Sequence, residues 1–283
     1  MPDIRQRFYF ANSPVRGEIV QIQQSLEQIL SRHAYPIVIQ RLLGEFVTAC
    51  VLLTATLKLE GRLSLQARGK GALTMMMAEC NHHHQVRAIA QLNEEIDCAD
   101  HATLAELLAE GLLVITLEPE HGQRYQGIVE LTGKTLADYL ENYFKQSEQL
   151  PTKLWLAANE TQAAGLLLQA LPQQHDEDTD RWSRLVQVTQ TVKAEELLAL
   201  TSDEILYRLY HEEEVTLPEA QSVSFSCTCS REGTANALVS IGQAECEDIL
   251  AEQGDIRLNC QFCHHEYVFN AADIRQLFAV KLH

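Results

Sequence analysis

The stretch "SFSCTCSREG" at residues 224–233 places Cys227 and Cys229 one residue apart, and "LNCQFCHHEY" at residues 258–267 places Cys260 and Cys263 two residues apart. Two close pairs of thiols brought together by the fold form a tetrahedral site of the kind that zinc prefers. A segment as short as residues 225–283 buries little apolar surface, so a bound metal would supply much of its folding free energy, on the order of 10 kcal/mol. The spacing therefore predicts a small C-terminal module that folds around one Zn²⁺ ion.

The compartment decides between metal binding and permanent disulfides. The first residues, "MPDIRQRFYFANSP", carry arginines but no apolar segment of a secretory signal, so we expect a cytoplasmic protein. Thiols stay reduced there, which disfavours structural disulfides. A thioredoxin-like active site is also disfavoured, because its Cys-x-x-Cys opens a helix, whereas "CQFCHHEYVF" leads into a strand-like segment. The neighbouring His264 and His265 are alternative ligands, but we interpret them as surface residues.

The remaining cysteines and one histidine run look unrelated to this site. Cys50 lies in an apolar helix, Cys246 lies on a predicted helix as a partly buried small side chain, and Cys80 and Cys98 are isolated. The run "NHHHQ" contains three consecutive histidines, which cannot all face one ion from a strand, so a loop tip is the favoured interpretation. These histidines are His82, His83 and His84.

Charge and hydropathy limit the classes of partner. The chain has 283 residues, 46% of them hydrophobic, and a formal net charge of -17, so attraction to nucleic acid or to an anionic membrane is not expected. The most apolar stretch, "LLGEFVTACVLLTATL" at residues 42–57, is shorter than a membrane span and contains Glu45, which predicts a buried helix.

Residues 1–170 predict one α+β domain with a mostly antiparallel sheet. Apolar spacing predicts helices over 17–33 and 37–61, and short apolar runs broken by turns predict strands within 62–80, 85–92, 112–120 and 125–133. A capping-box pattern at Thr103 and Glu106 predicts a helix start, and residues 135–151 predict an amphipathic helix. Residues 152–172 are interpreted as a strand followed by a helix.

Residues 171–224 differ from both neighbours in charge. They hold twelve Asp or Glu and four Lys or Arg, yet keep apolar residues at helical spacing, and Thr201 with Glu204 forms a second capping-box pattern. Short helices are marginal alone, and repulsion within "DEDTD" and "EEE" weakens them further. The pattern indicates a weakly held helical linker; an ordinary helical subdomain with a solvated acidic face is the alternative. In the module of residues 225–283 we expect helices over 243–253 and 271–280 and strands at 255–260 and 266–270.

The cysteine motif in this context resembles a known family. "CTCSRE" followed by "ILAEQGDIRLNCQFCHHEYVFNAADI", with "SPVRGEIV" and "GRLSLQARGKGAL" near the N-terminus, is similar to the redox-regulated 33 kDa chaperonin family, the bacterial heat shock protein 33 homologues. The resemblance covers essentially the whole chain. It implies an ATP-independent holdase that binds unfolded or partly folded client proteins and is inactive while reduced and zinc-bound. It further implies the disulfides Cys227–Cys229 and Cys260–Cys263 on oxidation, and a homodimer in that state.

Physical chemistry makes such a switch intelligible, since zinc-bound thiolates are the form that oxidants attack, and loss of two ligands removes the metal and its folding energy. A purely structural zinc protein, which would show no change of activity on oxidation, remains open from the sequence, and so do two rival functional classes. A zinc ribbon that binds nucleic acid is weakened by four Lys or Arg against eight Asp or Glu from Phe225 onward. An enzyme, either a thiol–disulfide oxidoreductase or a hydrolase in the N-terminal domain, is the second class. It is weakened because we find no nucleophile elbow, P-loop, glycine-rich dinucleotide turn or His-Glu-x-x-His motif, so we expect no enzymatic activity.

Overall fold

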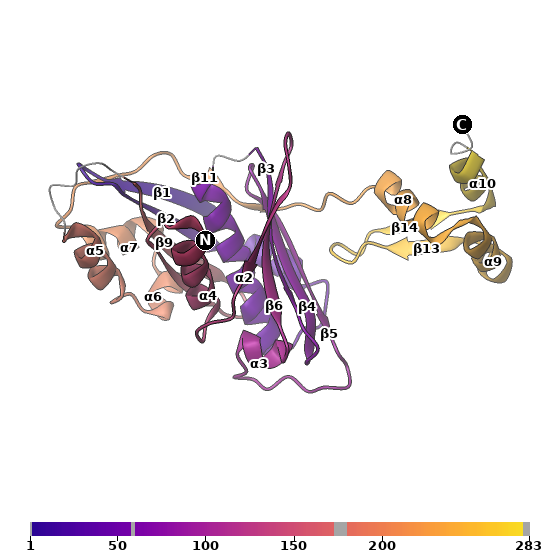
Figure 1. The fold of residues 1–283 in the computed structure, drawn as a ribbon, viewed down its shortest axis with the longest axis horizontal. Helices are drawn as coiled ribbons and strands as arrows, with labels where there is room; N and C mark the ends of the chain where they lie inside the picture. The colour runs from indigo at the N-terminus through magenta and orange to yellow at the C-terminus, as the bar shows by residue number, and fades with distance from the viewer. Residues whose placement is uncertain (1, 58–59, 173–179, 280–283) are drawn as a thin grey trace. The chain divides into compact units, whose positions relative to one another are not determined.

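The computed structural model describes residues 2–57, 60–172 and 180–279 (Figure 1). The chain divides into two compact units, residues 1–226 and residues 227–283, and each is described by itself. Both units mix helices with antiparallel strands, which confirms the α+β class expected from the sequence.

The first unit contains a sheet, called sheet A, built mainly from the two ends of its sequence. Its strand order is β10-β1-β2-β9-β8, and β11 also pairs with β1. All of its pairings are antiparallel. The strands are β1 (Ile4–Phe10), β2 (Val15–Ile22), β8 (Thr152–Ala158), β9 (Ala163–Ala170), β10 (Val215–Thr216) and β11 (Gln221–Ser222).

The second sheet of this unit, sheet B, contains the strands expected within residues 62–133. Its order is β12-β5-β4-β3-β6-β7, and the pairing is antiparallel except between β12 and β5. The strands are β3 (Gly61–Arg68), β4 (Leu73–Asn81), β5 (Gln85–Leu92), β6 (Leu112–Pro119), β7 (Tyr125–Val129) and β12 (Ser224–Phe225). The predicted run of strands is therefore confirmed.

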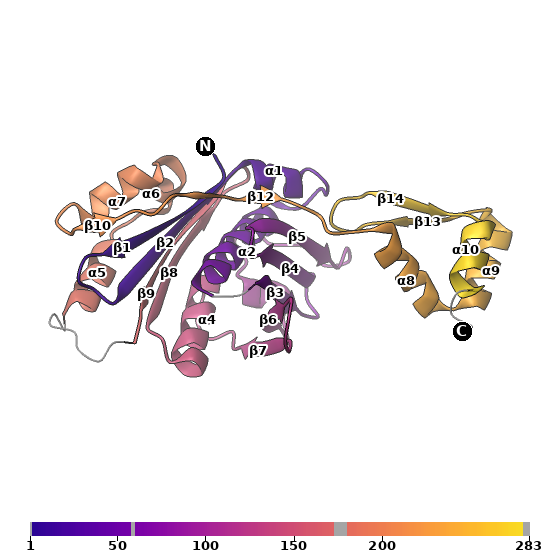
Figure 2. The same ribbon diagram turned by 90° about the horizontal axis from the view of Figure 1, so that it is seen from above.

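Helix α2 (Ile37–Thr56) fills the space between the two sheets and contacts strands of both (Figure 2). It confirms the buried helix expected for residues 42–57. By length and composition alone this helix is long and apolar enough to cross a membrane, but 72% of its most apolar window is buried inside the unit. Close packing requires a glycine opposite it, because a Cβ on Gly165 would lie 2.6 Å from the Thr48 Cγ2 atom.

The shorter helices α1 (Gln24–Leu30), α3 (Leu104–Leu108) and α4 (Leu136–Tyr143) cover the edges of this core, and α4 continues into the π-helical turn η1 (Phe144–Glu148). The helices α3 and α4 start where the sequence predicts. Thr103 and Glu106 form the predicted capping box of α3, and Thr135 with Asp138 forms one at the start of α4. Such reciprocal caps satisfy backbone N–H groups that the first helical turn leaves unpaired.

Two predictions in this unit were wrong, and both concern strands of sheet A. Residues 17–22 belong to β2, and helix α1 begins only at Gln24. The carboxylate of Asp3, on a distant segment, accepts from the N–H groups of Gln23, Gln24 and Ser25, so the signal for the helix start is not local. Residues 163–170 form β9, not a helix, and the turn before it is fixed by Asn159, whose Oδ1 accepts from two backbone N–H groups.

Three short helices lie on the face of sheet A opposite α2 (Figure 2). They are α5 (Arg181–Thr189), α6 (Ala194–Ala199) and α7 (Ser202–Tyr210), and α7 carries the predicted Thr201–Glu204 capping box. Their apolar residues share a core with β1, β2 and β9; the helical members buried there are Leu185, Leu197, Ile205, Leu206, Leu209 and Tyr210. That residues 171–224 act as a separable linker stays a prediction, and residues 176–179 of its acidic run lie outside the described residues.

The segment of residues 215–226, called the strap, runs from α7 toward the cysteines and pairs with both sheets in turn. Its three short strands add to β1 twice and to β5 once. Gln221 Oε1 accepts from Arg5 Nη2 at 2.5 Å and lies 2.7 Å from His84 Nε2, which joins the strap to β1 and to the β4–β5 turn. Val223 is buried in the main core, and the guanidinium of Arg32 lies over the Phe225 ring.

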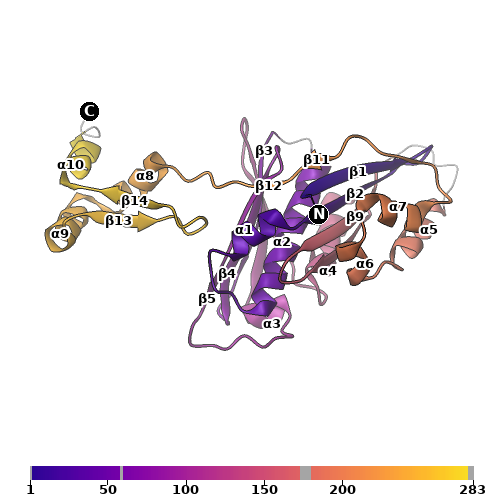
Figure 3. The same cartoon turned by 180° about the vertical axis from the view of Figure 1, so that it is seen from behind.

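The second unit is small. It consists of α8 (Arg231–Ile241), α9 (Gln243–Gln253), the hairpin of β13 (Ile256–Asn259) and β14 (Glu266–Phe269), and α10 (Ala271–Ala279) (Figure 3). Both predicted strands and both predicted helices are present, and α8 was not foreseen. Among the described residues of this unit, the buried core consists of Leu238, Cys246, Ile256, Phe269 and Ile274, and further apolar side chains are partly buried against it. This is a modest core for such a segment, as the sequence suggested.

Candidate metal centre

The four paired cysteines come from two turns of the second unit. Cys227 and Cys229 precede helix α8, whose start is fixed by Ser230, since its hydroxyl accepts from the N–H of Gly233. Cys260 and Cys263 lie in the loop between β13 and β14. That loop is closed by two backbone hydrogen bonds, from the Cys260 N–H to the His265 carbonyl at 3.0 Å and from the His264 N–H to the Cys260 carbonyl at 2.8 Å.

The fold brings the four sulfur atoms into one cluster. All four lie within 4.8 Å of one another. The Cys227 and Cys260 Sγ atoms are 3.6 Å apart, and those of Cys229 and Cys263 are 3.4 Å apart. A tetrahedral zinc ion with Zn–S bonds of about 2.3 Å would separate its sulfurs by about 3.8 Å. The residues present therefore fit a four-thiolate metal ion.

Backbone N–H groups lower the pKa of three of these thiols. Those of Cys263 and Phe262 act on Cys260, that of His265 acts on Cys263, and that of Cys229 acts on Cys227. Such a hydrogen bond stabilises a thiolate, because the donor dipole faces the negative charge.

Two of the thiols, those of Cys227 and Cys263, resist deprotonation without a cation. Burial raises the pKa of Cys227 and raises the pKa of Cys263 to about 12. Burial also acts on Cys260, but the backbone donors and neighbouring thiols outweigh it, so its pKa lies below the ordinary value. Four thiolates this close repel one another, and a divalent cation removes that penalty, so the arrangement suits a metal ion.

Tyr267 adds a contact that sequence reasoning missed. Its hydroxyl donates to Cys229 Sγ at 3.2 Å, and this hydrogen bond is the main reason why the pKa of Tyr267 is raised to about 12. The His265 ring lies edge-on to the Tyr267 ring, with centroids 4.6 Å apart. The only sequence signal was a tyrosine four positions after the second pair, which spacing alone does not mark as functional.

The other cysteines and histidines lie apart from this cluster. Among the described residues it is the one group of three or more His, Cys, Asp or Glu whose ligand atoms converge. Cys50 and Cys80 are buried in the first unit, where burial raises both pKa values, that of Cys80 to about 12. His264 and His265 are exposed, as predicted. His82 and His83 occupy the β4–β5 turn with their rings 3.9 Å apart, whereas His84 is buried beside the strap.

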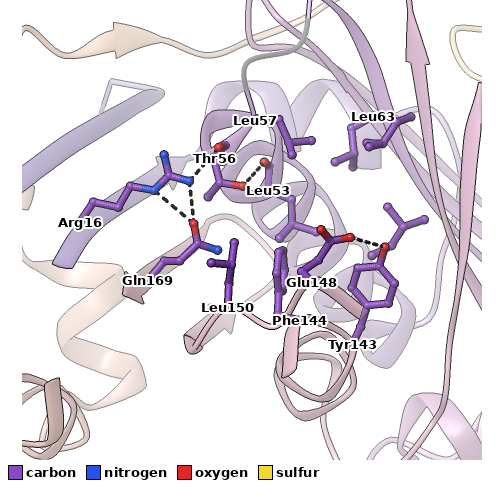
Figure 4. A pocket seen from close by; sticks show the side chains of 12 residues that line it. Arg16, Leu53, Thr56, Leu57, Leu63, Tyr143, Phe144, Glu148, Leu150 and Gln169 are labelled. Atoms are coloured by element: carbon purple, nitrogen blue, oxygen red, sulfur yellow. Dashed lines mark hydrogen bonds between the residues drawn. The ribbon is translucent and has the colours of Figure 1, made fainter. Parts of the chain in front are cut away.

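A pocket in the first unit offers no competing site (Figure 4). Its volume is about 70 Å³, well below the roughly 300–1,000 Å³ of ordinary ligand pockets. Its polar groups bind one another: Arg16 donates to Gln169 Oε1 and to the Thr56 carbonyl, and Tyr143 donates to Glu148. Among the described residues, this pocket is lined by no buried side-chain polar atom without a hydrogen-bond partner.

Comparison with known proteins agrees with this fold. Residues 3–270 match the model of the Hsp33 protein family. The chain is 50% identical to proteins named 33 kDa chaperonin from Shewanella oneidensis, over 98% of this chain and 96% of the relative, and from Pseudomonas aeruginosa, over 98% and 95%. A crystal structure of the 33 kDa chaperonin (heat shock protein 33 homolog) from Thermotoga maritima shares the fold, with a TM-score of 0.85, 21% identity and 99% coverage of both chains. The resemblance drawn from the cysteine motif is confirmed, and the chain belongs to the Hsp33 family of chaperones.

Proposed function

We propose that this chaperone is a redox-regulated, ATP-independent holdase, which binds unfolding proteins during oxidative stress and prevents their aggregation. The observation that carries the proposal is the cluster of four sulfurs within 4.8 Å, placed in a unit whose described residues include a small core of five buried side chains, with other apolar side chains partly buried against them. A core of that size leaves the fold of residues 227–283 dependent on whatever holds the sulfurs together.

In the reduced state, Cys227, Cys229, Cys260 and Cys263 hold one Zn²⁺ ion per chain. When bound, the ion stabilises the deprotonated sulfurs and cross-links the turn before α8 to the β13–β14 hairpin. The backbone N–H groups at three of the sulfurs keep the thiolates oriented toward a common centre.

Oxidation removes the metal ligands and so unfolds the second unit. Two thiolates, Cys260 and Cys263, transfer two electrons to hydrogen peroxide; the S–S bond forms, the O–O bond breaks, and two waters leave after uptake of two protons. Cys227 and Cys229 form the second disulfide with a second peroxide. Each disulfide removes two of the four metal ligands, so the cross-link and its folding free energy are lost together.

The strap is covalently joined to residue 227, so unfolding of residues 227–283 leaves the strap without a folded unit at its C-terminal end. The strap is held to the first unit by three two-residue strands, by the Gln221 contacts with Arg5 and His84, and by the burial of Val223. Its loosening frees α5, α6 and α7, whose apolar faces then become available to unfolded clients. A segment that folds on binding can wrap varied partners, which suits a holdase.

The remaining assignments follow from composition and from the family. The net charge of -17 argues against nucleic acid and anionic membranes as partners. We place the chain in the cytoplasm, where its thiols are reduced until oxidants accumulate. Release of the apolar faces also favours a homodimer in the oxidised state, and no catalytic turnover is required by the proposed action.

The experiment compares reduced chain with chain treated by peroxide and mild heat, using light scattering of a chemically denatured test protein without ATP. We expect only the oxidised chain to suppress aggregation. Cys260→Ser prevents one disulfide and removes a ligand, whereas Cys98→Ser removes a thiol outside the cluster and is the matched control. Equal suppression by reduced and oxidised chain would refute redox control, and gel shift of DNA or turnover of a dithiol would favour the rival classes.

A further inference from the structure

The hydroxyl of Tyr267 joins the two halves of the cysteine site. Tyr267 lies on β14, where it pairs with Leu258 of β13, so its position is fixed by the hairpin that carries Cys260 and Cys263. Its hydroxyl reaches across to Cys229 Sγ, 38 positions earlier in the chain, at 3.2 Å. The ring packs with the small core of the second unit, which leaves the hydroxyl aimed at the sulfur.

This hydrogen bond differs in kind from those at the other sulfurs. Cys227, Cys260 and Cys263 accept from backbone N–H groups, which every residue other than proline supplies and which no side-chain substitution removes. The bond to Cys229 comes from a side chain. Its strength is therefore encoded at a single position, and replacing tyrosine by phenylalanine deletes it while keeping the ring.

A hydroxyl that donates to a thiolate acts in two ways. It withdraws electron density from the sulfur, which makes the sulfur a weaker nucleophile toward oxidants and electrophiles. It also fixes the direction of the ligand, and the loss of such an outer contact typically costs about 10–100-fold in metal affinity.

We propose that Tyr267 is a positioning residue of the cysteine site, which tightens the grip on Zn²⁺ and lowers the reactivity of Cys229. The inference rests on the proposed zinc-binding function of the four cysteines. It adds a residue outside the ligand set that sets how easily one half of the site is attacked.

The test uses the full chain with Tyr267→Phe, and Tyr207→Phe as the matched control, because the Tyr207 side chain lies on α7 and is 75% exposed. Zinc affinity is measured by competition with a colorimetric chelator, and we expect about 10–100-fold weaker binding for Tyr267→Phe only. Reactivity is measured on the reduced, zinc-loaded chain, in which the sulfurs are already deprotonated, by limited labelling with N-ethylmaleimide. In this reaction the sulfur adds to the double bond and the adjacent carbon takes a proton from water. Mass spectrometry of the peptides should show Cys229 labelled several-fold faster, relative to Cys260, in Tyr267→Phe.

A second variant distinguishes loss of the hydrogen bond from a simple folding defect. Site-specific 3-fluorotyrosine at position 267 keeps the shape but makes the hydroxyl a stronger donor, so we expect slower labelling of Cys229 than in the unmodified chain. Unchanged zinc affinity and labelling in both variants would overturn the inference while leaving the proposed function intact. Absence of bound zinc from the reduced, unmodified chain would instead overturn the proposed function itself.

Discussion

The Sγ atoms of Cys227 and Cys260 lie 3.6 Å apart, although 33 positions separate the two residues in the sequence. Cys229 and Cys263 stand in the same relation at 3.4 Å. In the folded site, a sulfur of one sequence pair is therefore close enough to a sulfur of the other pair to form a disulfide with it after a small movement. Distance alone does not select the disulfides that oxidation will form.

Chain entropy selects the near neighbours once the site begins to open, because short loops close more readily than long ones. We therefore predict that peroxide yields Cys227–Cys229 and Cys260–Cys263. Trypsin cuts after Arg231 and Arg257, so near-neighbour disulfides leave the two cysteine peptides separate, whereas cross-pairs join them. Non-reducing mass spectrometry dominated by joined peptides would show that oxidation occurs within the closed site.

Removal of the metal should unfold the second unit and spare the first. Among its described residues the second unit has five buried core side chains, whereas the first unit has an extensive core around α2. We therefore expect only the second unit to depend on the free energy that a structural zinc ion contributes, which is on the order of 10 kcal/mol. Hydrogen exchange after chelation should show rapid exchange over 231–279 and continued protection over 37–56. Retained protection over β13 and β14 would contradict this dependence.

The apolar face of α7 should control client binding directly. Ile205 is 1% exposed against sheet A, whereas Tyr207 on the same helix is 75% exposed. Ile205→Glu places an unpaired carboxylate in that core, at a cost of about 3–5 kcal/mol, which favours detachment of the helix. We expect this variant to suppress client aggregation while still reduced, and Tyr207→Glu to behave as the unmodified chain.

The measurement for that pair is light scattering with thiols kept reduced, together with the zinc content of both variants. Full zinc content in Ile205→Glu would show that the second unit remains closed. Failure of Ile205→Glu to suppress aggregation, despite loss of helical signal from α5–α7, would place client binding elsewhere.

Acid should weaken the anchoring of the strap through His84. Burial lowers the pKa of His84, Gln221 opposes this by accepting a hydrogen bond from the ring, and the nearby charges of Arg5, Arg7 and His83 lower the pKa further. Glu18 is buried and pairs with both Arg5 and Arg7. The folded chain binds the proton less readily than the unfolded chain, so stability falls as the pH drops below about 6.5, the ordinary histidine pKa.

Urea unfolding of the first unit at pH 7.5 and 5.5 measures this effect. His84→Gln keeps a polar side chain without a titrating ring and should lose less stability on acidification than the unmodified chain. His83→Gln, at the exposed neighbouring position, is the matched control. An identical loss of stability in all three proteins would mean that His84 does not titrate in this range.

Local patterns predicted the elements whose signals are local. Strands β3 to β7 of sheet B, the capping boxes at Thr103 and Thr201 and the two cysteine pairs were recognisable, because each depends on residues a few positions apart. Strands β2 and β9 were mistaken for helices because α2 covers one face of sheet A and α5–α7 cover the other. Strands buried on both faces lose the alternation of apolar and polar residues that marks a half-buried strand.

Contacts between distant segments account for the rest. The start of α1 is set by Asp3, and the Tyr267 hydroxyl meets Cys229 only once the hairpin and the turn are assembled. No spacing rule in the sequence encodes either contact. The pairing of the four cysteines was predictable from the sequence, whereas the contact between the Tyr267 hydroxyl and Cys229 was visible only in three dimensions.

The most direct test follows three quantities in one sample during peroxide treatment: free Zn²⁺, remaining thiols and light scattering of an unfolding client. We predict that one Zn²⁺ per chain is released as four of the eight thiols disappear, and that suppression of aggregation rises in step with that release. A reduced chain without bound zinc, or zinc release that leaves residues 227–283 folded and client binding unchanged, would contradict the account.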